Sequence, residues 1–170
     1  MTEYYVGIDN SHSGSIAMID HESNVVFTML MPLINNEANY ERIIDMIHGH
    51  NGGQHNTRVM LEEPHKFAKG INSVRIMWSC FQRIKVGLEC SSMLPDCILP
   101  NQWQHKMLEV YGDKNSKGWA EKRVIEIWGD RFTKEYKSKK SREGINDALL
   151  IAEFCRRSHL GLAMPSKTCK

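Results

Sequence analysis

Two apolar runs in this sequence each end in an acidic residue, and a third acid lies in a late helical pattern. The first run covers residues 4–9 and ends at Asp9, and the second covers residues 57–62 and ends at Glu62. The third acid is Asp147. A buried strand that ends in a carboxylate carries charge to the rim of a sheet, where desolvation is costly unless a cation lies nearby. The three acids therefore predict a divalent-metal site that the fold assembles from separate segments.

The composition is that of an ordinary soluble domain. The 170 residues are 41% hydrophobic and 25% charged, and no apolar run approaches the roughly 20 residues that span a bilayer. The first residues lack the pattern of a signal peptide, and the five cysteines are scattered without a CxxC pair. We therefore expect one domain over residues 1–170 with a flexible tail from about residue 160. We also expect reduced thiols, no zinc site and a cytoplasmic location.

Positive charge is concentrated between residues 114 and 142. This segment holds ten Lys or Arg residues and four acids, a net charge of +6 in a chain whose total is +2. A basic segment directly before the Asp147 helix would attract a polyanion toward an acidic site. The same pattern is typical of a solvated helix face, so the charge alone leaves nucleic-acid binding open.

Hydrophobic periodicity predicts strands and helices in a mixed order. The predicted strands cover residues 3–9, 14–20, 25–31, 57–62 and 96–100, and the predicted helices cover residues 37–48, 71–90, 101–111, 117–129 and 144–158. The first three strands are joined by short turns, so we expect an antiparallel meander. The later strands alternate with helices, which favours an α/β fold with a mixed sheet covered on both faces.

Four short motifs occur in order along the chain, at residues 6–9, 60–64, 98–103 and 146–152. Their order and spacing resemble the ribonuclease H-like fold, and within it the RuvC family of Holliday junction resolvases, in particular its phage members. The resemblance implies a mixed five-stranded sheet, an antiparallel meander followed by parallel strands, flanked by helices. It also implies a homodimer that binds four-way or branched DNA and nicks it with Mg²⁺ or Mn²⁺, two ions per active site. A phage origin would place the protein in the host cytoplasm.

By position, Asp9, Glu62 and Asp147 match the three catalytic, metal-binding carboxylates of the family. The family usually carries Asp or His three or four residues before the last aspartate, where this sequence has Gly144 and Glu143. If the last helix includes Glu143, this residue shares a face with Asp147, and the resemblance makes it a fourth catalytic and metal-binding residue. If the helix begins at Gly144, Glu143 is a first-turn acid that only favours the helix dipole.

The resemblance also assigns DNA contacts to several basic residues and to one loop aromatic residue. The candidates are Lys117, Lys137, Lys139, Lys140, Arg142, Phe67 and Lys69. Lys117 matches a lysine near the scissile phosphate, and the alternative is a surface lysine at a helix start. Phe67 either stacks on bases at the crossover or packs internally. The helix at 71–90 carries an apolar stripe of the kind from which the family builds its dimer interface, and core packing is the alternative.

The predicted function is a structure-selective endonuclease that attacks phosphodiesters with water and leaves 5′-phosphate and 3′-hydroxyl ends. Oxygen ligands suit Mg²⁺ and Mn²⁺ and argue against zinc. The departure at Gly144 keeps one alternative open, a protein of the same fold that binds branched DNA with weak or no nuclease activity. A looser enzyme that also nicks flaps and replication forks is a second alternative.

Overall fold

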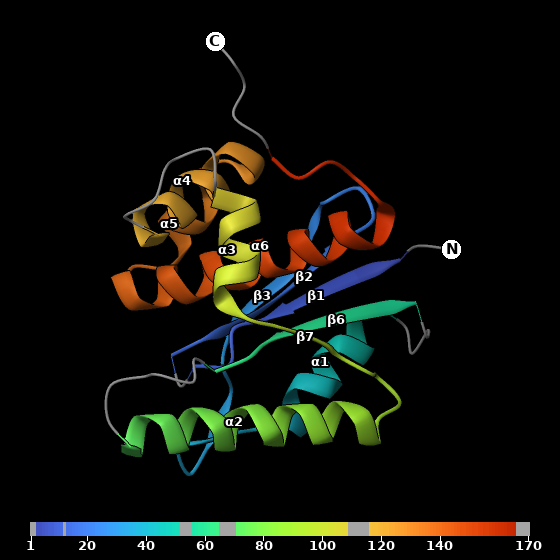
Figure 1. Cartoon of the computed structure of the whole chain (residues 1–170), viewed down its shortest axis with the longest axis vertical. Coiled ribbons are helices and arrows are strands. Elements are labelled where there is room, and N and C mark those ends of the chain that lie inside the picture. Colours follow the sequence, from blue (N-terminus) through green and yellow to red (C-terminus); the bar gives the residue numbers. More distant parts are fainter. Residues whose placement is uncertain (1–2, 12, 52–55, 65–70, 109–115, 166–170) are drawn as a thin grey trace.

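A five-stranded mixed sheet forms the centre of the protein (Figure 1). The computed structural model describes residues 3–11, 13–51, 56–64, 71–108 and 116–165. In sheet order, the strands are β3 (Val25–Leu30), β2 (Ser15–Asp20), β1 (Tyr4–Ile8), β6 (Thr57–Glu62) and β7 (Asp96–Ile98). β1 pairs antiparallel with β2, and β2 with β3, whereas the β1–β6 and β6–β7 pairs are parallel. The predicted fold class is confirmed, an antiparallel meander followed by parallel strands.

Helices cover both faces of this sheet (Figure 1). One face carries α1 (Tyr40–Asn51) and α2 (Ile71–Cys90), and the other carries α3 (Pro100–Leu108), α4 (Ser116–Trp128), α5 (Arg131–Glu135) and α6 (Lys139–Leu160). Each face has its own core of buried apolar residues, so the sheet is sandwiched between two helical layers. Within the described part of the chain, no helix is long and apolar enough to span a membrane.

The helix predicted from residue 37 begins later than expected. Residues 37 and 38 form the short strand β5 (Glu37–Ala38), which pairs with β4 (Leu33–Ile34), so α1 begins at Tyr40. The short helix α5 was not predicted. Both differences involve elements of only two to five residues, which are too short to show a hydrophobic period.

The last helix, α6, begins five residues before the predicted start at residue 144. Ser138 caps it, because the Ser138 side chain accepts a hydrogen bond from Ser141 N. Glycine in a helix interior costs about 1 kcal/mol relative to alanine, which is why the pattern suggested a helix start at Gly144. Gly144 is instead a buried residue inside α6, and Glu143 is helical as well.

Gly7 of β1 marks the point where α6 lies against the sheet. A Cβ atom built on Gly7 would lie 2.2 Å from Ala148 O and 2.3 Å from Ala152 N. Carbon atoms in ordinary contact are about 3.5–4.0 Å apart, so only glycine allows this approach. Because α6 carries Asp147, the contact at Gly7 fixes how close Asp147 comes to the end of β1.

We expect Gly7→Ala to destabilise the folded state by about 3 kcal/mol, because the added methyl group must displace backbone atoms. Urea unfolding would show this as a lower midpoint. Gly49→Ala is the matched control, because a Cβ at Gly49 of α1 has no atom within 4 Å. That control should be neutral or stabilising by about 0.5 kcal/mol. If Gly7→Ala unfolds at the wild-type midpoint, α6 does not pack on β1 in this way.

Candidate active site

Asp9 and Glu62 lie side by side at the carboxyl ends of two neighbouring parallel strands. β1 and β6 pair with Ile8 opposite Leu61, and the next residue along each strand is one of the two acids. Neighbouring strands in a sheet lie about 4.8 Å apart. Parallel pairing therefore brings together two acids that are far apart in the sequence.

The alternation of side chains directs both acids to the face that α6 covers. Along β1, Tyr5 belongs to the core on the α6 side and Gly7 touches α6, so Asp9 follows on the same face. Along β6, Met60 belongs to that core, and Glu62 lies two residues further on. The two acids therefore lie on the face of the sheet that is covered by the helix with the third predicted acid.

Asp147 of α6 completes the group, as the electrostatics of Glu62 show. The pKa of Glu62 is raised well above its ordinary value, first by burial and then by the negative charges of Asp9 and Asp147, whereas a hydrogen bond from Trp103 opposes the rise. Protein atoms surround most of the Glu62 carboxylate, although the residue keeps partial solvent exposure. The structure thus places Asp9 and Asp147 within electrostatic reach of Glu62.

A second enclosed glutamate, Glu153, shows what a structural acid looks like in this fold. Glu153 accepts hydrogen bonds from Arg156 Nε at 2.8 Å, Arg157 Nε at 2.7 Å and Ser23 Oγ at 2.8 Å. Burial acts to raise the pKa of Glu153, but these hydrogen bonds bring it below its ordinary value. Glu62 has the opposite environment, since the charges that shift its pKa are those of other acids. An acid held in this way is typical of a functional site.

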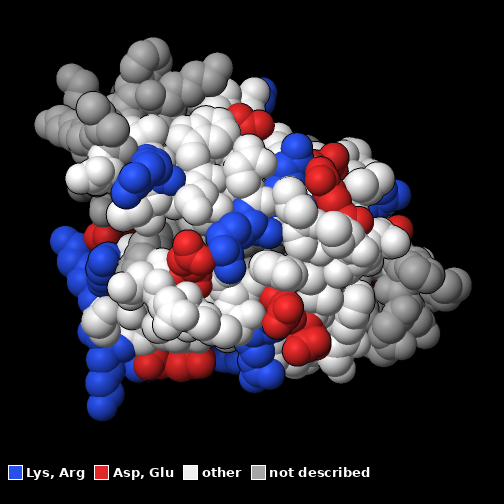
Figure 2. All heavy atoms as spheres, turned by 90° about the horizontal axis from the view of Figure 1, so that it is seen from below, with Lys and Arg blue, Asp and Glu red and all other residues white. Residues whose placement is uncertain are grey.

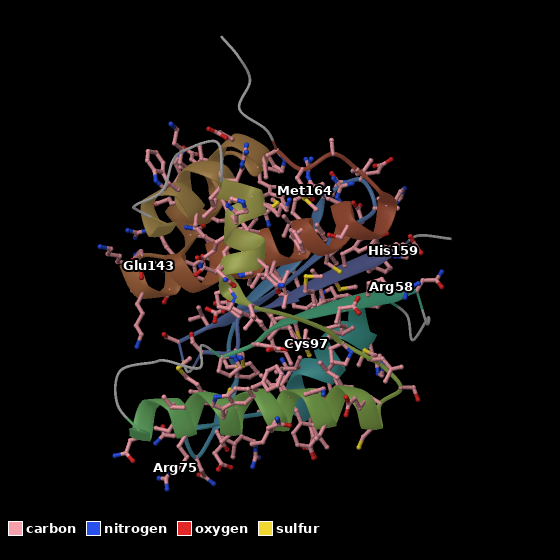
Figure 3. The ribbon with its side chains drawn as sticks, viewed as in Figure 1. Arg58, Arg75, Cys97, Glu143, His159 and Met164 are labelled. Carbon is pink, nitrogen blue, oxygen red and sulfur yellow. The ribbon has the colours of Figure 1, made fainter. Side chains whose placement is uncertain are left out.

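Glu143 lies in α6, four residues before Asp147, so the two acids share one face of the helix. Figure 3 shows Glu143 at the N-terminal end of α6. Its side chain is 21% exposed, and Glu143 Oε1 is 4.0 Å from Nζ of Lys139. The condition for Glu143 to reach the site, a helix that already includes it, is therefore met.

Gly144 leaves no room for the acid or histidine that is usual in the RuvC family. A Cβ atom on Gly144 would lie 2.7 Å from Ser13 O and 2.9 Å from Ser15 Oγ. The helix therefore packs directly against the turn that follows Asp9. A side chain larger than that of glycine is therefore excluded three residues before Asp147, whereas Glu143 lies four residues before it.

Polar contacts around the acids were not predicted. Ser11 N donates to Asp9 Oδ1 at 3.0 Å, and Ser11 Oγ donates to Asp9 Oδ2 at 3.3 Å. Asn10 is almost completely buried, and its Nδ2 donates to the main-chain oxygen of Glu62. In the sequence, Asn10 and Ser11 look like ordinary turn residues. No local signal identifies the role of Asn10, because its partner depends on the pairing of β1 with β6.

The chemistry of this donor set fits a hard divalent cation. Carboxylate oxygens are the ligands that Mg²⁺ and Mn²⁺ prefer. Two unpaired carboxylates about 4 Å apart repel by about 4 kcal/mol at an effective dielectric of about 20, and a dication offsets that repulsion. Among the residues that the structure describes, no three His, Cys, Asp or Glu side chains already stand in position to hold an ion. Ion binding would therefore require the carboxylates to turn toward a common centre.

The basic residues predicted to contact DNA differ in their surroundings. Lys137, Lys139 and Lys140 are exposed around the start of α6. Arg142 has structural contacts, because its Nη1 donates to Tyr136 O at 3.2 Å and to Lys137 O at 2.9 Å. Its guanidinium thereby holds the segment between α5 and α6, whereas the three lysines extend from the surface.

The remaining predicted contacts lie outside the described residues. Phe67 and Lys69 belong to residues 65–70, which the structure does not describe. Lys117 lies in the first turn of α4, and its side chain is not described. These three assignments stay predictions.

Comparison with known proteins finds solved structures of similar fold. No protein-family model and no curated protein matches the chain. The chain is similar to Thermus thermophilus RuvC in complex with a Holliday junction substrate, at 14% identity and a TM-score of 0.66 over 96% of this chain and 99% of that chain. It is also similar to a further structure of Thermus thermophilus RuvC, at 15% identity and a TM-score of 0.60 over 98% and 100%.

The protein therefore has a ribonuclease H-like fold. Within that class its architecture is the one seen in RuvC, over nearly the whole chain. The resemblance predicted from the four motifs is confirmed at the level of the fold.

Proposed function

We propose that the protein is a metal-dependent, structure-selective endonuclease that nicks four-way junctions and other branched DNA. The observation that supports this proposal is that Asp9 and Glu62 follow paired positions of β1 and β6, and that the charges of Asp9 and of Asp147 on α6 both act on Glu62. The similarity of the fold to RuvC bound to a Holliday junction supports branched DNA as the substrate class.

The acids are the residues that would hold the metal. Asp9, Glu62, Asp147 and Glu143 supply oxygen ligands for Mg²⁺ or Mn²⁺, two ions per site. When bound, such ions supply an activated water and stabilise the charge that develops on the scissile phosphate. The chain restrains one of these acids, since Ser11 donates to both oxygens of Asp9. Hydrolysis would leave 5′-phosphate and 3′-hydroxyl ends.

The lysines around the start of α6 are suited to hold the substrate. Lys137, Lys139 and Lys140 are exposed on the same end of the helix that carries Glu143. Contacts of this kind fix the register of a DNA backbone without reading its sequence. The net charge of +6 between residues 114 and 142 would draw the polyanion toward this side. Lys117, Phe67 and Lys69 remain proposed contacts on the basis of the motif resemblance.

We also propose a homodimer with α2 at the interface. Phe81 and Ile84 of α2 are buried in the core, whereas Ile76 and Val86 are 47% and 52% exposed. Figure 2 views the molecule from below Figure 1, the side on which α2 lies, and shows both signs of charge interspersed with uncharged surface. A mixed surface suits contact with protein better than contact with DNA, which favours a surface of one positive sign.

Cleavage of labelled DNA tests the proposed function. A mobile four-way junction, a flap and a linear duplex are each incubated with Mg²⁺, with Mn²⁺ and with EDTA. We expect paired symmetric nicks in the junction with either metal and no nicks in EDTA. Equal attack on the linear duplex would contradict selectivity for branched DNA. Junction binding without nicking would instead identify a branched-DNA-binding protein of the same fold.

A further inference from the structure

Trp103 of α3 places its indole N–H against a carboxylate of the candidate site. Trp103 Nε1 donates to Glu62 Oε1 at 2.7 Å, and the Trp103 side chain is completely buried. An indole N–H is a donor only, so a buried tryptophan needs an acceptor. Bonds to a charged acceptor are shorter and about twice as strong as bonds between neutral groups. The acceptor of Trp103 is Glu62, one of the three predicted acids.

The chain around Trp103 is built to hold this contact. β7 pairs with β6 so that Ile98 lies opposite Glu62. The connection into α3 is fixed by two hydrogen bonds, from Leu99 N to Gln102 Oε1 at 3.1 Å and from Gln102 N to Leu99 O at 3.0 Å. Trp103 follows in the first turn of α3 and packs into the core on the α6 side. Both ends of the Trp103–Glu62 bond are therefore anchored in regular structure.

The bond acts on a carboxylate whose ionised form is disfavoured by burial and by neighbouring negative charges. Asp9 and Asp147 both act on Glu62 through their negative charges. Without a ligand, that repulsion favours rotation of the Glu62 carboxylate away from the other two acids. A donor that engages Oε1 limits this rotation and restricts which oxygen faces the site. In metal sites, partners of the ligands set ligand orientation in this way, and their replacement costs about 10–100-fold in affinity or activity.

We propose that Trp103 is a positioning residue for the metal centre. Its indole holds Oε1 of Glu62, so that Oε2 is the oxygen presented to the divalent ion. This inference rests on the proposed function, because it requires that Glu62 be a metal ligand. It adds a residue from α3 to a site whose predicted acids lie directly after β1, on β6 and on α6.

Trp128 supplies a matched control within the same protein. Its Nε1 also donates a short hydrogen bond, to the main-chain oxygen of Ser23 at 2.6 Å. Trp128 packs against the same core as Trp103. Its hydrogen-bond acceptor, however, is a main-chain oxygen in a turn and not a carboxylate of the candidate site. Replacing either residue by phenylalanine removes one indole hydrogen bond and keeps an aromatic ring. Only Trp103→Phe should affect metal binding.

The test measures Mn²⁺ affinity without DNA, by electron paramagnetic resonance of the free ion. The proteins compared are the wild type, Trp103→Phe, Trp128→Phe and Asp9→Asn. We expect the Kd for Mn²⁺ to rise about 10-fold or more in Trp103→Phe. It should stay within about 2-fold of wild type in Trp128→Phe, and Asp9→Asn should lose most of the binding, since a ligand matters more than its partner.

The outcomes separate this inference from the function on which it rests. If Asp9→Asn binds poorly and Trp103→Phe binds like the wild type, the metal centre stands and the role of Trp103 is wrong. Equal weakening in the Trp103 and Trp128 variants would also overturn it, because the loss would then follow from general packing. If the wild type shows no saturable binding, or if Asp9→Asn matches it, the metal centre itself is wrong.

A second measurement distinguishes positioning from structural damage. In junction cleavage, Trp103→Phe should raise the half-saturating Mn²⁺ concentration about 10-fold or more, while the rate at saturating Mn²⁺ recovers to within about 3-fold of wild type. A rate that stays low at saturating Mn²⁺ would argue against a positioning role.

The wild-type protein provides a readout if Trp103→Phe does not fold. The chain has four tryptophans, so its ¹⁵N spectrum should contain four indole resonances. Phenylalanine variants of Trp78, Trp119 and Trp128 identify the Trp103 resonance by elimination. Added Mg²⁺ should shift that resonance more than the other three. An unmoved Trp103 resonance in a protein that binds Mg²⁺ would overturn the proposal.

Discussion

Asp9→Asn is expected to abolish junction cleavage while leaving junction binding intact. Asparagine has the size of aspartate, and its Oδ1 can still accept the hydrogen bond from Ser11 N, so the turn after β1 is preserved. What the substitution removes is a negative charge beside Glu62 and a strong ligand for a divalent cation. Loss of a partner to a metal ligand already costs about 10–100-fold, so loss of the ligand should cost more than about 100-fold in rate.

Two assays on the same preparation check this expectation. Nicking of the labelled junction is followed in Mg²⁺, and binding is followed by gel shift in EDTA. Asp45→Asn is the control, because Asp45 is an exposed acid on α1, which packs on the opposite face of the sheet from α6. That variant should cut and bind like the wild type. Wild-type cleavage by Asp9→Asn would show that the active site lies elsewhere.

Glu62→Gln is expected to stabilise the metal-free protein although it removes activity. The raised pKa of Glu62 means that its ionised form is disfavoured in the folded state. The contribution of Glu62 to stability is therefore fully present below its unfolded pKa, near 4.5, and is lost as pH rises through the folded pKa. Glutamine stays neutral throughout and can still accept the hydrogen bond from Trp103. At neutral pH we expect Tm to rise by about 2–4 °C, which is about 1 kcal/mol for a chain of this size.

Glu153→Gln supplies the control of opposite sign. The pKa of Glu153 is lowered on balance, by hydrogen bonds that include those from Arg156 and Arg157. Its ionised form therefore stabilises the folded protein above the unfolded pKa, and that stability is lost as pH falls. Thermal unfolding in EDTA should place Glu62→Gln above the wild type and Glu153→Gln below it. A lower Tm for Glu62→Gln would mean that the wild-type carboxylate is stabilised in its charged form, contrary to the raised pKa of Glu62.

Added Mg²⁺ should reverse the order of the wild type and Glu62→Gln. Binding to the folded state alone raises stability by mass action, so the wild type gains and a variant that lacks a ligand gains little. Junction cleavage by Glu62→Gln should meanwhile fall more than about 100-fold, by the same reasoning as for Asp9. We thus expect the ionised Glu62 to lower the stability of the metal-free protein and to raise it when Mg²⁺ is bound.

Much of the fold could be predicted from local patterns. The helix at 71–90 was predicted with the bounds that α2 has, because its core spacing is sustained over many turns. The predicted start of α6 at residue 144 was wrong, because the cap at Ser138 and the packing of Gly144 against Ser13 outweigh the poor helix propensity of glycine. Local sequence shows propensity, but it does not show which neighbour a residue will meet.

The same limit explains what was found and missed in the candidate site. Asp9 and Glu62 could be predicted because each ends an apolar strand, a pattern visible within a few residues. Asn10 and Trp103 could not, because both are defined by their bonds to Glu62 across a strand pair or from another helix. Those bonds exist only once the register of β6 against β1 and β7 is set.

The position of α6 in the chain has a consequence for when the candidate site can form. Asp9 and Glu62 are synthesised before Asp147, which lies on α6. This helix packs directly against the backbone of Gly7. A nascent or truncated polypeptide that lacks α6 carries two of the three central acids and cannot assemble the site. If the proposed function is right, DNA cleavage would have to wait until α6 has docked onto the sheet.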